Sequence, residues 1–199
     1  MCSSDLKDAG AFAAQSKVEV APNTKWYYSS GTTNIISRIT HQTIGDDYNS
    51  FPYREIFNKI GAYSMVIEPD ASGTFVGSSF SYATARDWAR FGLVFLNDGV
   101  WNNERILPEG WVKYSTTPAD AAPHGEYGAQ IWLNAGNKNN PTDKRFPDVP
   151  NDMYLMDGFE GQCVVMIPSR DVLIVRLGLS QTREFDTNAF VRDILKSLE

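Results

Sequence analysis

Residues 162–179 read Gln-Cys-Val-Val-Met-Ile-Pro-Ser-Arg-Asp-Val-Leu-Ile-Val-Arg-Leu-Gly-Leu, and this stretch decides the fold. Its two halves, Gln162–Ile167 and Val172–Leu179, are rich in Val, Ile and Leu, which favour β-strands. The residues between them, Pro168–Asp171, have the length and composition of a hairpin loop. We therefore predict that the two halves pair as antiparallel strands.

The segments beside this hairpin predict a sheet covered by helices. A further strand is expected around Tyr154–Met156. Downstream, Thr187–Leu198 has apolar residues at helical spacing, and we expect Phe190, Ile194 and Leu195 to face the sheet. Together these elements predict an α+β architecture, with an antiparallel sheet flanked by helices.

Upstream of the sheet, the clearest helix begins at Thr84. Thr84 is a favourable N-cap residue, and Asp87 follows at the distance of a capping box. The apolar positions before Gly99 recur at helical spacing, which indicates a face buried in the core and not a cofactor site. These positions are Trp88, Phe91, Phe95 and Leu96.

Shorter elements are predicted elsewhere, and they alternate with loops. Helices are expected at Thr32–Thr43 and at Tyr53–Ile60, the second of which ends at Gly61. Turn residues are frequent from Ser64 to Phe80, so we expect a loop there with at most short strands. Later elements are a helix over Leu107–Tyr114, begun by Pro108, and a strand over Tyr127–Leu133.

A long surface loop is predicted at Asn134–Asn151, because Gly, Asn, Asp and Pro are dense there. Loops of this length in a compact domain either connect two elements through solvent or border a binding site. The sequence leaves both interpretations open.

The composition favours one globular domain that acts on small molecules. The 199 residues are 42% hydrophobic and 13% aromatic, which is enough to form a substantial core. The net charge of −6 and the scattered Lys and Arg residues argue against nucleic acid as a partner. Cys2 and Cys163 are the only cysteines, and they suggest no disulfide framework, so the redox compartment stays open.

The first residues differ in character from the rest. Met1–Leu6 is an unusual natural start, and we expect residues 1–20 to be a non-native or poorly ordered lead to a single domain over residues 21–199. The chain contains no apolar stretch of membrane-spanning length, and its start lacks the pattern of a signal peptide. Localisation and oligomeric state stay open.

A candidate catalytic tyrosine lies in Tyr28-Ser29-Ser30, on a turn just before an amphipathic run that contains Ile35, Ile36 and Ile39. A phenol has an ordinary pKa near 10, so it acts as a base at neutral pH only where neighbours stabilise the phenolate. The alternative is a core aromatic residue whose hydroxyl binds a backbone carbonyl.

Three motifs together resemble the serine hydrolases of the β-lactamase and penicillin-binding-protein superfamily. They are Tyr28-Ser29-Ser30, the Thr-Ala-Arg-Asp-Trp-Ala-Arg-Phe-Gly run at Thr84–Gly92, and the segment Gly158–Asp171. The sequence is most similar to the β-lactamase-related branch, which includes class C enzymes, esterases and 6-aminohexanoate-dimer hydrolases. The resemblance runs from about Ala21 to the C-terminus, and it implies the C-terminal portion of that fold, a partial β-lactamase/DD-peptidase-like structure.

The resemblance implies roles for six residues. Tyr28 would relay protons between the serine nucleophile and the leaving group, and Ser30 would hydrogen-bond the lysine or the substrate amide. Phe159-Glu160-Gly161 would be the third motif, and Gly161 and Gln162 would offer a backbone N–H to the oxyanion, with room for the acyl group because glycine has no Cβ. Phe159 stands where Lys or His is more usual, which favours an esterase or amide hydrolase over a penicillin-hydrolysing enzyme. A β-bulge or a tight hairpin entry would also explain Gly161.

The nucleophile is the missing part of this scheme. A hydrolase of this type needs Ser-x-x-Lys on a buried helix, and the family places it far upstream of the tyrosine. One string matches, Ser4-Asp5-Leu6-Lys7, and we reject it because it lies at a polar terminus too close to Tyr28. His41 and His124 lie in polar contexts typical of surface histidines, and no spacing suggests a metal or other cofactor.

Two hypotheses follow. The first is the C-terminal part of a serine hydrolase for small-molecule amides or esters, which lacks the Ser-x-x-Lys segment and is inactive alone. The second is a noncatalytic binding or scaffold protein with the same fold. If the first holds, an apolar surface should be exposed near Tyr28, where the absent helical segment would pack.

Overall fold

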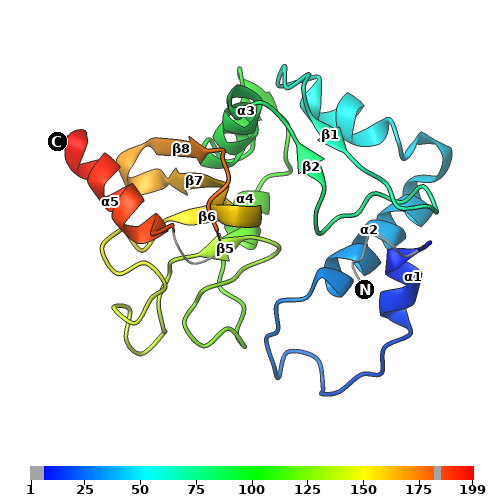
Figure 1. The fold of residues 1–199 in the computed structure, drawn as a ribbon, viewed down its shortest axis with the longest axis horizontal. Helices are drawn as coiled ribbons and strands as arrows, with labels where there is room; N and C mark the ends of the chain where they lie inside the picture. The colour runs from blue at the N-terminus through cyan, green and yellow to red at the C-terminus, as the bar shows by residue number, and fades with distance from the viewer. Residues whose placement is uncertain (1–6, 182–184) are drawn as a thin grey trace. The chain divides into compact units, whose positions relative to one another are not determined.

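The computed structural model describes residues 7–181 and 185–199. The chain divides into two compact units, Met1–Asp87 and Trp88–Glu199 (Figure 1). Within the described residues, no helix combines the length and the apolar character needed to cross a bilayer.

The second unit is built on a four-stranded antiparallel sheet of order β5-β6-β7-β8. The predicted hairpin is confirmed: its strands pair from Cys163 opposite Arg176 to Ile167 opposite Val172. The second strand ends at Arg176, three residues earlier than the predicted Leu179. The strands are β5 (Trp132–Leu133), β6 (Tyr154–Asp157), β7 (Cys163–Ile167) and β8 (Val172–Arg176).

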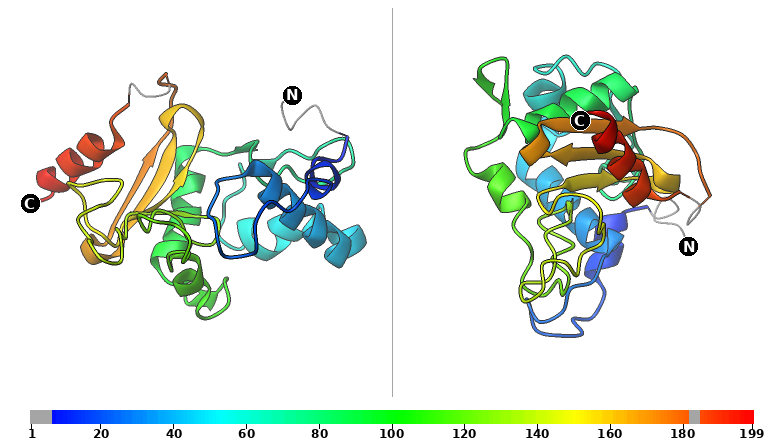
Figure 2. Two further views of the ribbon diagram at one scale, coloured as in Figure 1. Left: turned by 90° about the horizontal axis from the view of Figure 1, so that it is seen from below. Right: turned by 90° about the vertical axis from the view of Figure 1, so that its left-hand side faces the viewer.

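Helix α5 (Thr187–Ser197) covers one face of this sheet (Figure 2). Asp186 caps it by accepting a hydrogen bond of 2.9 Å from Ala189 N. Phe190, Ile194 and Leu195 pack against the sheet as predicted, and so does Val191, which is fully buried. Burial in this layer raises the pKa of the Cys163 thiol to about 11.

Helix α3 (Ala85–Leu96) covers the opposite face, and three of the four residues of its predicted apolar stripe pack in the core there (Figure 2). Gly92 allows the close approach, because a Cβ there would lie 2.6 Å from Leu173 Cδ1 and 2.8 Å from Val164 Cγ1. The sheet is therefore the middle of three layers. The helix residues packed against this face are Trp88, Phe95 and Leu96.

The N-terminus of α3 is capped through a third residue. Thr84 Oγ1 accepts from Asp87 N at 3.3 Å, as an N-cap should. The Asp87 carboxylate accepts from Ser64 Oγ at 2.6 Å, and Ser64 Oγ accepts from Thr84 N at 2.9 Å. Ser64 thus links the two members of the predicted capping box.

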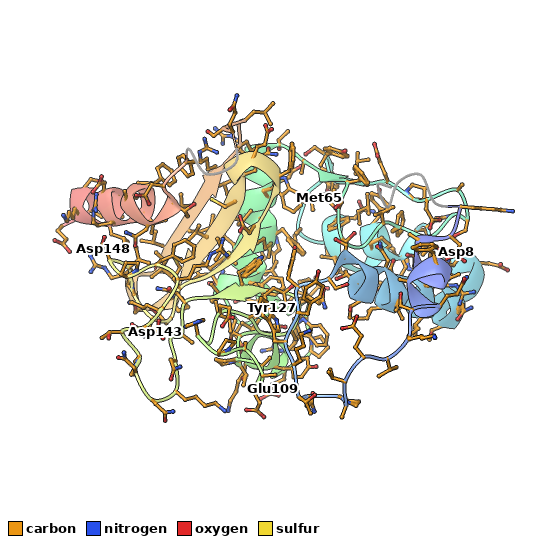
Figure 3. The ribbon with its side chains drawn as sticks, turned by 60° about the horizontal axis from the view of Figure 1, so that its bottom comes forward. Asp8, Met65, Glu109, Tyr127, Asp143 and Asp148 are labelled. Atoms are coloured by element: carbon orange, nitrogen blue, oxygen red, sulfur yellow. The ribbon has the colours of Figure 1, made fainter. Side chains whose placement is uncertain are left out.

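Two helices form much of the first unit, α1 (Ala9–Ala14) and α2 (Ser30–Ile44). Helix α1 was not predicted, and it lies within residues 1–20, which we expected to be a non-native or poorly ordered lead. Asp8 explains the helix: its carboxylate accepts from Ala11 N at 2.7 Å and from Arg38 Nε of α2 at 3.1 Å (Figure 3). The cap and the ion pair together hold α1 on α2.

Helix α2 packs its polar side against the rest of the first unit. Asn34 is buried, and Ser37 Oγ donates to Phe75 O at 2.7 Å. Ile36 and Ile39 are 47% and 56% exposed. The predicted helix is confirmed, but most of its expected apolar stripe lies on the outside.

Several shorter elements differ from their predictions. The second expected helix is a π-helical turn, η3 (Tyr53–Phe57). The expected strand over Tyr127–Leu133 is reduced to β5, because Gln130 has φ 63° and the chain folds back there to bridge Tyr127 with Trp132. Helix α4 (Trp111–Ser115) begins after Gly110, in the left-handed region at φ 77°, and not at Pro108.

The remaining elements are short. β1 (Val66–Ile67) pairs with β2 (Ser81–Tyr82), which agrees with a loop containing at most short strands. A small hairpin, β3 (Val100–Trp101) with β4 (Glu104–Arg105), was not predicted. A 3-10 turn, η2 (Gly45–Asp47), follows α2.

Candidate functional site

Tyr28 lies in an extended segment that leads directly into α2. Ser29 is the N-cap residue of the helix, with φ −140° and ψ 117°, and Ser30 is its first residue. The Tyr28 side chain is 50% exposed, so it is not a core aromatic residue. Its ring is accessible to a substrate at the start of a helix, and its catalytic role remains a prediction.

The predicted third motif forms a tight turn between β6 and β7. Phe159–Gly161 is a short 3-10 turn, closed where Gly158 N donates to Gln162 O at 2.7 Å. Glu160 and Gly161 have φ values of 54° and 78°, in the left-handed region that favours glycine. The alternative interpretation of Gly161, a tight hairpin entry, therefore describes its conformation.

The space beside Gly161 is occupied by protein. A Cβ at Gly161 would lie 3.0 Å from Arg176 Nη1 and 3.4 Å from two side-chain atoms of Phe185. Glycine is favoured here by its positive φ of 78°, and a side chain would also press on the guanidinium. This reason differs from the predicted one, which was room for an acyl group.

The predicted oxyanion donor is engaged within the turn. Gln162 N donates to Phe159 O at 3.3 Å, and Gln162 Nε2 donates to the same oxygen at 3.2 Å. The Phe159 ring is 73% exposed, and it places an apolar surface at this end of the sheet. Gln162 N–H could serve an oxyanion only by exchanging this long bond for one to the substrate.

The structure groups the predicted residues in two sets. Tyr28 and Ser30 lie together in the first unit, at the start of α2. The other four lie together in the second unit. Three of them form the 3-10 turn Phe159–Gly161, and Gln162 directly follows it. Sequence reasoning missed Arg176, which contacts this turn. Its signal was a cationic residue in an apolar strand, opposite Cys163 in the hairpin register.

Both histidines take part in local structure. His41 Nδ1 lies 2.8 Å from Thr74 Oγ1, and its ring stacks on Tyr48 with centroids 4.2 Å apart. His124 Nδ1 lies 3.0 Å from Asp143 Oδ2 on the surface. Within the described part of the chain, no group of three or more His, Cys, Asp or Glu side chains is placed to hold a metal ion.

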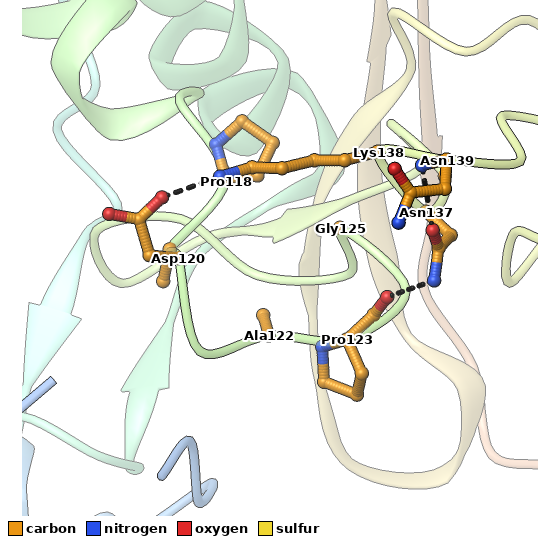
Figure 4. Close-up of a pocket in the computed structure, with 10 residues that line it drawn as sticks. Pro118, Asp120, Ala122, Pro123, Gly125, Asn137, Lys138 and Asn139 are labelled. Atoms are coloured by element: carbon orange, nitrogen blue, oxygen red, sulfur yellow. Dashed lines mark hydrogen bonds and ion pairs between the residues drawn. The ribbon is translucent and has the colours of Figure 1, made fainter. Parts of the chain in front are cut away.

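A shallow cavity of about 190 Å³ borders the long loop, where residues 118–125 meet residues 136–139 (Figure 4). Lys138 Nζ and Asp120 Oδ1 pair across it at 2.6 Å, and Asn137 Nδ2 donates to Pro123 O at 2.8 Å. Both charged side chains are exposed to solvent. None of the six predicted site residues lines this cavity.

The long loop itself is organised from within. Asn134 is buried, and its amide Nδ2 donates to three backbone carbonyl oxygens of the loop at distances of 2.9 to 3.3 Å. Asp143 and Asp148 mark its outer part in Figure 3. The loop therefore has a defined path and is more than a solvated connection.

A family model described as Beta-lactamase matches residues 3–195. The chain belongs to the beta-lactamase family. The match begins further upstream than Ala21, where the resemblance was expected to start. The predicted superfamily is thereby confirmed.

The relatives of this beta-lactamase-family chain include a 6-aminohexanoate-dimer hydrolase of Paenarthrobacter ureafaciens. It is 25% identical over 170 residues, which cover 77% of this chain and 39% of the relative. The chain thus spans well under half the length of this curated relative.

Two solved structures share the fold. A Bacillus anthracis protein assigned as a 6-aminohexanoate-dimer hydrolase has a TM-score of 0.69 at 21% identity, covering 94% of this chain and 46% of its own. A Bacteroides dorei DSM 17855 protein assigned as a beta-lactamase has a TM-score of 0.70 at 13% identity, covering 94% and 62%. These likenesses confirm the predicted α+β fold with its antiparallel sheet.

Proposed function

We propose that this chain is the C-terminal part of a serine hydrolase that cleaves amide or ester bonds in small molecules through an acyl-enzyme. The observation that carries the proposal is the half-exposed Tyr28 phenol at the start of α2, inside the region matched by the family model. A phenol must come within hydrogen-bond reach of a substrate to exchange protons with it, and the exposure of Tyr28 allows this.

Five of the six predicted residues enter this proposal by name, and Glu160 enters it only as part of the turn that contains Phe159 and Gly161. Tyr28 takes the proton of the serine hydroxyl and returns it to the leaving group, and Ser30 hydrogen-bonds the lysine or the substrate amide. A backbone N–H at Gly161 or Gln162 stabilises the oxyanion. Phe159 offers no cation to an anionic substrate, which favours neutral esters and amides.

The serine and lysine come from a Ser-x-x-Lys segment encoded upstream. Two observations support this part of the proposal. The chain covers 39% of its curated relative, and Ile36 and Ile39 of α2 are exposed on the helix that Tyr28 precedes. An upstream helical segment that packs on these side chains would remove their apolar surface from water.

The experiment compares the 199-residue chain with a version extended by its own upstream coding sequence. We expect a serine-directed fluorophosphonate to label the extended protein at its Ser-x-x-Lys serine, and to leave the shorter chain unlabelled. The extended protein should hydrolyse p-nitrophenyl acetate, and Tyr28→Phe should lower kcat by about 100- to 10,000-fold, the range of general acid–base catalysis. Tyr27→Phe, a neighbour that is 75% exposed, is the matched control and should retain activity.

Other outcomes would overturn the proposal. An upstream sequence without Ser-x-x-Lys, or an extended protein that resists labelling, would support the noncatalytic binding or scaffold protein instead. Labelling of the shorter chain at Ser4 would show that our rejection of that serine is wrong.

A further inference from the structure

The guanidinium of Arg176 lies against the turn at Phe159–Gly161. Arg176 is the last residue of β8, and in the hairpin register it is opposite Cys163, two residues beyond the turn. Its Nη1 donates to Gly161 O at 2.8 Å, and its Nη2 donates to Ser180 Oγ at 2.6 Å. One side chain thus joins the turn to the chain that leaves β8.

A second bond fixes the neighbouring peptide. Ser180 N donates to Glu160 O at 3.1 Å. The two carbonyl groups on either side of Gly161 therefore both point toward the segment around Arg176 and Ser180. In a trans peptide the N–H points opposite to the C=O, and no described peptide bond is cis. The N–H groups of Gly161 and Gln162 are accordingly turned away from Arg176.

The guanidinium is itself held in place. Its carbon lies 3.7 Å from the centroid of the Phe185 ring, in cation–π geometry. Phe185 in turn contacts Phe190 of α5 edge to face, with centroids 5.2 Å apart. The space that a Cβ at Gly161 would need is filled by the guanidinium. Phe190, Phe185 and Arg176 therefore form a continuous series of contacts from α5 to the turn.

We propose that Arg176 is a positioning residue for the oxyanion donors of this site: by holding Gly161 O, it fixes the Gly161–Gln162 peptide with its N–H turned away from the guanidinium, so that this N–H can exchange its long bond to Phe159 O for one to the reacting carbonyl. The inference rests on the proposed function. A cation on the carbonyl also polarises the peptide, so the Gln162 N–H becomes a stronger donor. Arginine suits the task because its planar fork reaches Gly161 O and Ser180 Oγ together. The ammonium of a lysine is a compact charge without this fork, so it is less suited to hold both oxygens.

The first test is made on the 199-residue chain by nuclear magnetic resonance of its backbone amides. Arg176→Met removes the donors, and Arg176→Lys keeps the charge without the fork. We expect Arg176→Met to shift the Gln162 ¹⁵N resonance and to speed exchange of the Gln162 and Ser180 amides about tenfold, which corresponds to one lost hydrogen bond. Arg176→Lys should change the Gln162 resonance and the two exchange rates in the same direction, but by less than Arg176→Met.

Arg145→Met is the matched control. Arg145, in the long loop, pairs with Asp157 at 2.8 Å and lies 4.4 Å from the Trp132 ring centroid, so it is a cation that pairs with the last residue of β6, next to the turn. This variant should leave the exchange rates of the Gln162 and Ser180 amides within about twofold of the wild-type rates, as expected for a lost exposed ion pair. The proposal would be overturned if Arg176→Met left the Gln162 resonance and the exchange rates of the Gln162 and Ser180 amides unchanged. It would also be overturned if amide exchange at Val165, in the middle of β7, were accelerated equally.

The second test uses the extended protein. If Arg176 positions the donors, Arg176→Lys should lower kcat for p-nitrophenyl acetate and leave KM nearly unchanged, because the interaction strengthens in the transition state. A rise in KM with constant kcat would refute the positioning role. The amide measurements do not depend on a nucleophile, so failure of the proposed function and failure of this inference are told apart.

Discussion

The buried amide of Asn134 should be among the most sensitive positions in the second unit. Asn134 is 1% exposed and stands at the start of the long loop. It accepts from Phe146 N at 2.8 Å and donates to Phe146 O at 2.9 Å and Pro150 O at 3.0 Å, with a longer bond of 3.3 Å to Val149 O. Asn134→Ala removes all four bonds and leaves their backbone partners buried.

The expected cost follows from these distances. Three of the bonds are short, and each should contribute about 1 to 1.5 kcal/mol, with a further penalty for backbone groups left without partners. We expect Asn134→Ala to lower the free energy of unfolding by about 3 to 5 kcal/mol, a large part of the total for an ordinary domain.

Urea unfolding followed by tryptophan fluorescence measures this loss, since Trp132 lies beside Asn134. With a slope near 2 kcal/mol per molar urea, the midpoint should fall by about 2 M. Asn137→Ala is the control: Asn137 belongs to the same loop, donates to Pro123 O at its surface, and should cost about 0.5 kcal/mol. If Asn134→Ala costs less than about 1 kcal/mol, the loop is not organised by this amide and the argument from buried polar partners is wrong.

Two further predictions concern the first unit and the helix–sheet contact. Burial alone raises the pKa of Asp70, but hydrogen bonds from Ser72, Ala9 and Thr74 lower it overall, so its contribution to stability is present above the unfolded pKa of about 3.9 and is lost as the pH falls through the lower folded value. When the pH is lowered from about 5 to about 2, the urea midpoint of Asp70→Asn should therefore fall less than that of the wild type, because the variant has no carboxylate to protonate. Gly92→Ala should cost about 1 to 3 kcal/mol by overpacking α3 against the sheet, and a thermal midpoint equal to the wild type would contradict the 2.6 Å contact behind this estimate.

The sheet and its covering helices were predictable because their signals are local. The Val- and Ile-rich halves around Pro168 specify a hairpin by composition and loop length. The stripe of α3 and the apolar spacing of α5 specify buried faces by period alone. Each of these patterns is contained within fewer than about 20 residues, the usual extent of a helix or hairpin signal.

Predictions failed where distant residues decide the local structure. Helix α1 depends on Arg38, which pairs with Asp8 from the next helix. The outward position of Ile36 depends on polar contacts that Ser37 makes with Tyr48 and Phe75. The periodicity of α2 indicates that one side is apolar, but it does not state which side the rest of the chain covers.

Residue patterns along the chain were enough to predict the α+β class, the central hairpin, the buried face of α3 and the candidate residues Tyr28 and Gly161. The packing of the folded chain was needed to show that Arg176 lies against Gly161 and that Asn134 holds the long loop from within. Strand and helix signals are repeating patterns of residue type, which can be read along the chain. The hydrogen bond from Arg176 to Gly161 leaves no such pattern, because it joins two particular residues that meet only once β7 and β8 have paired.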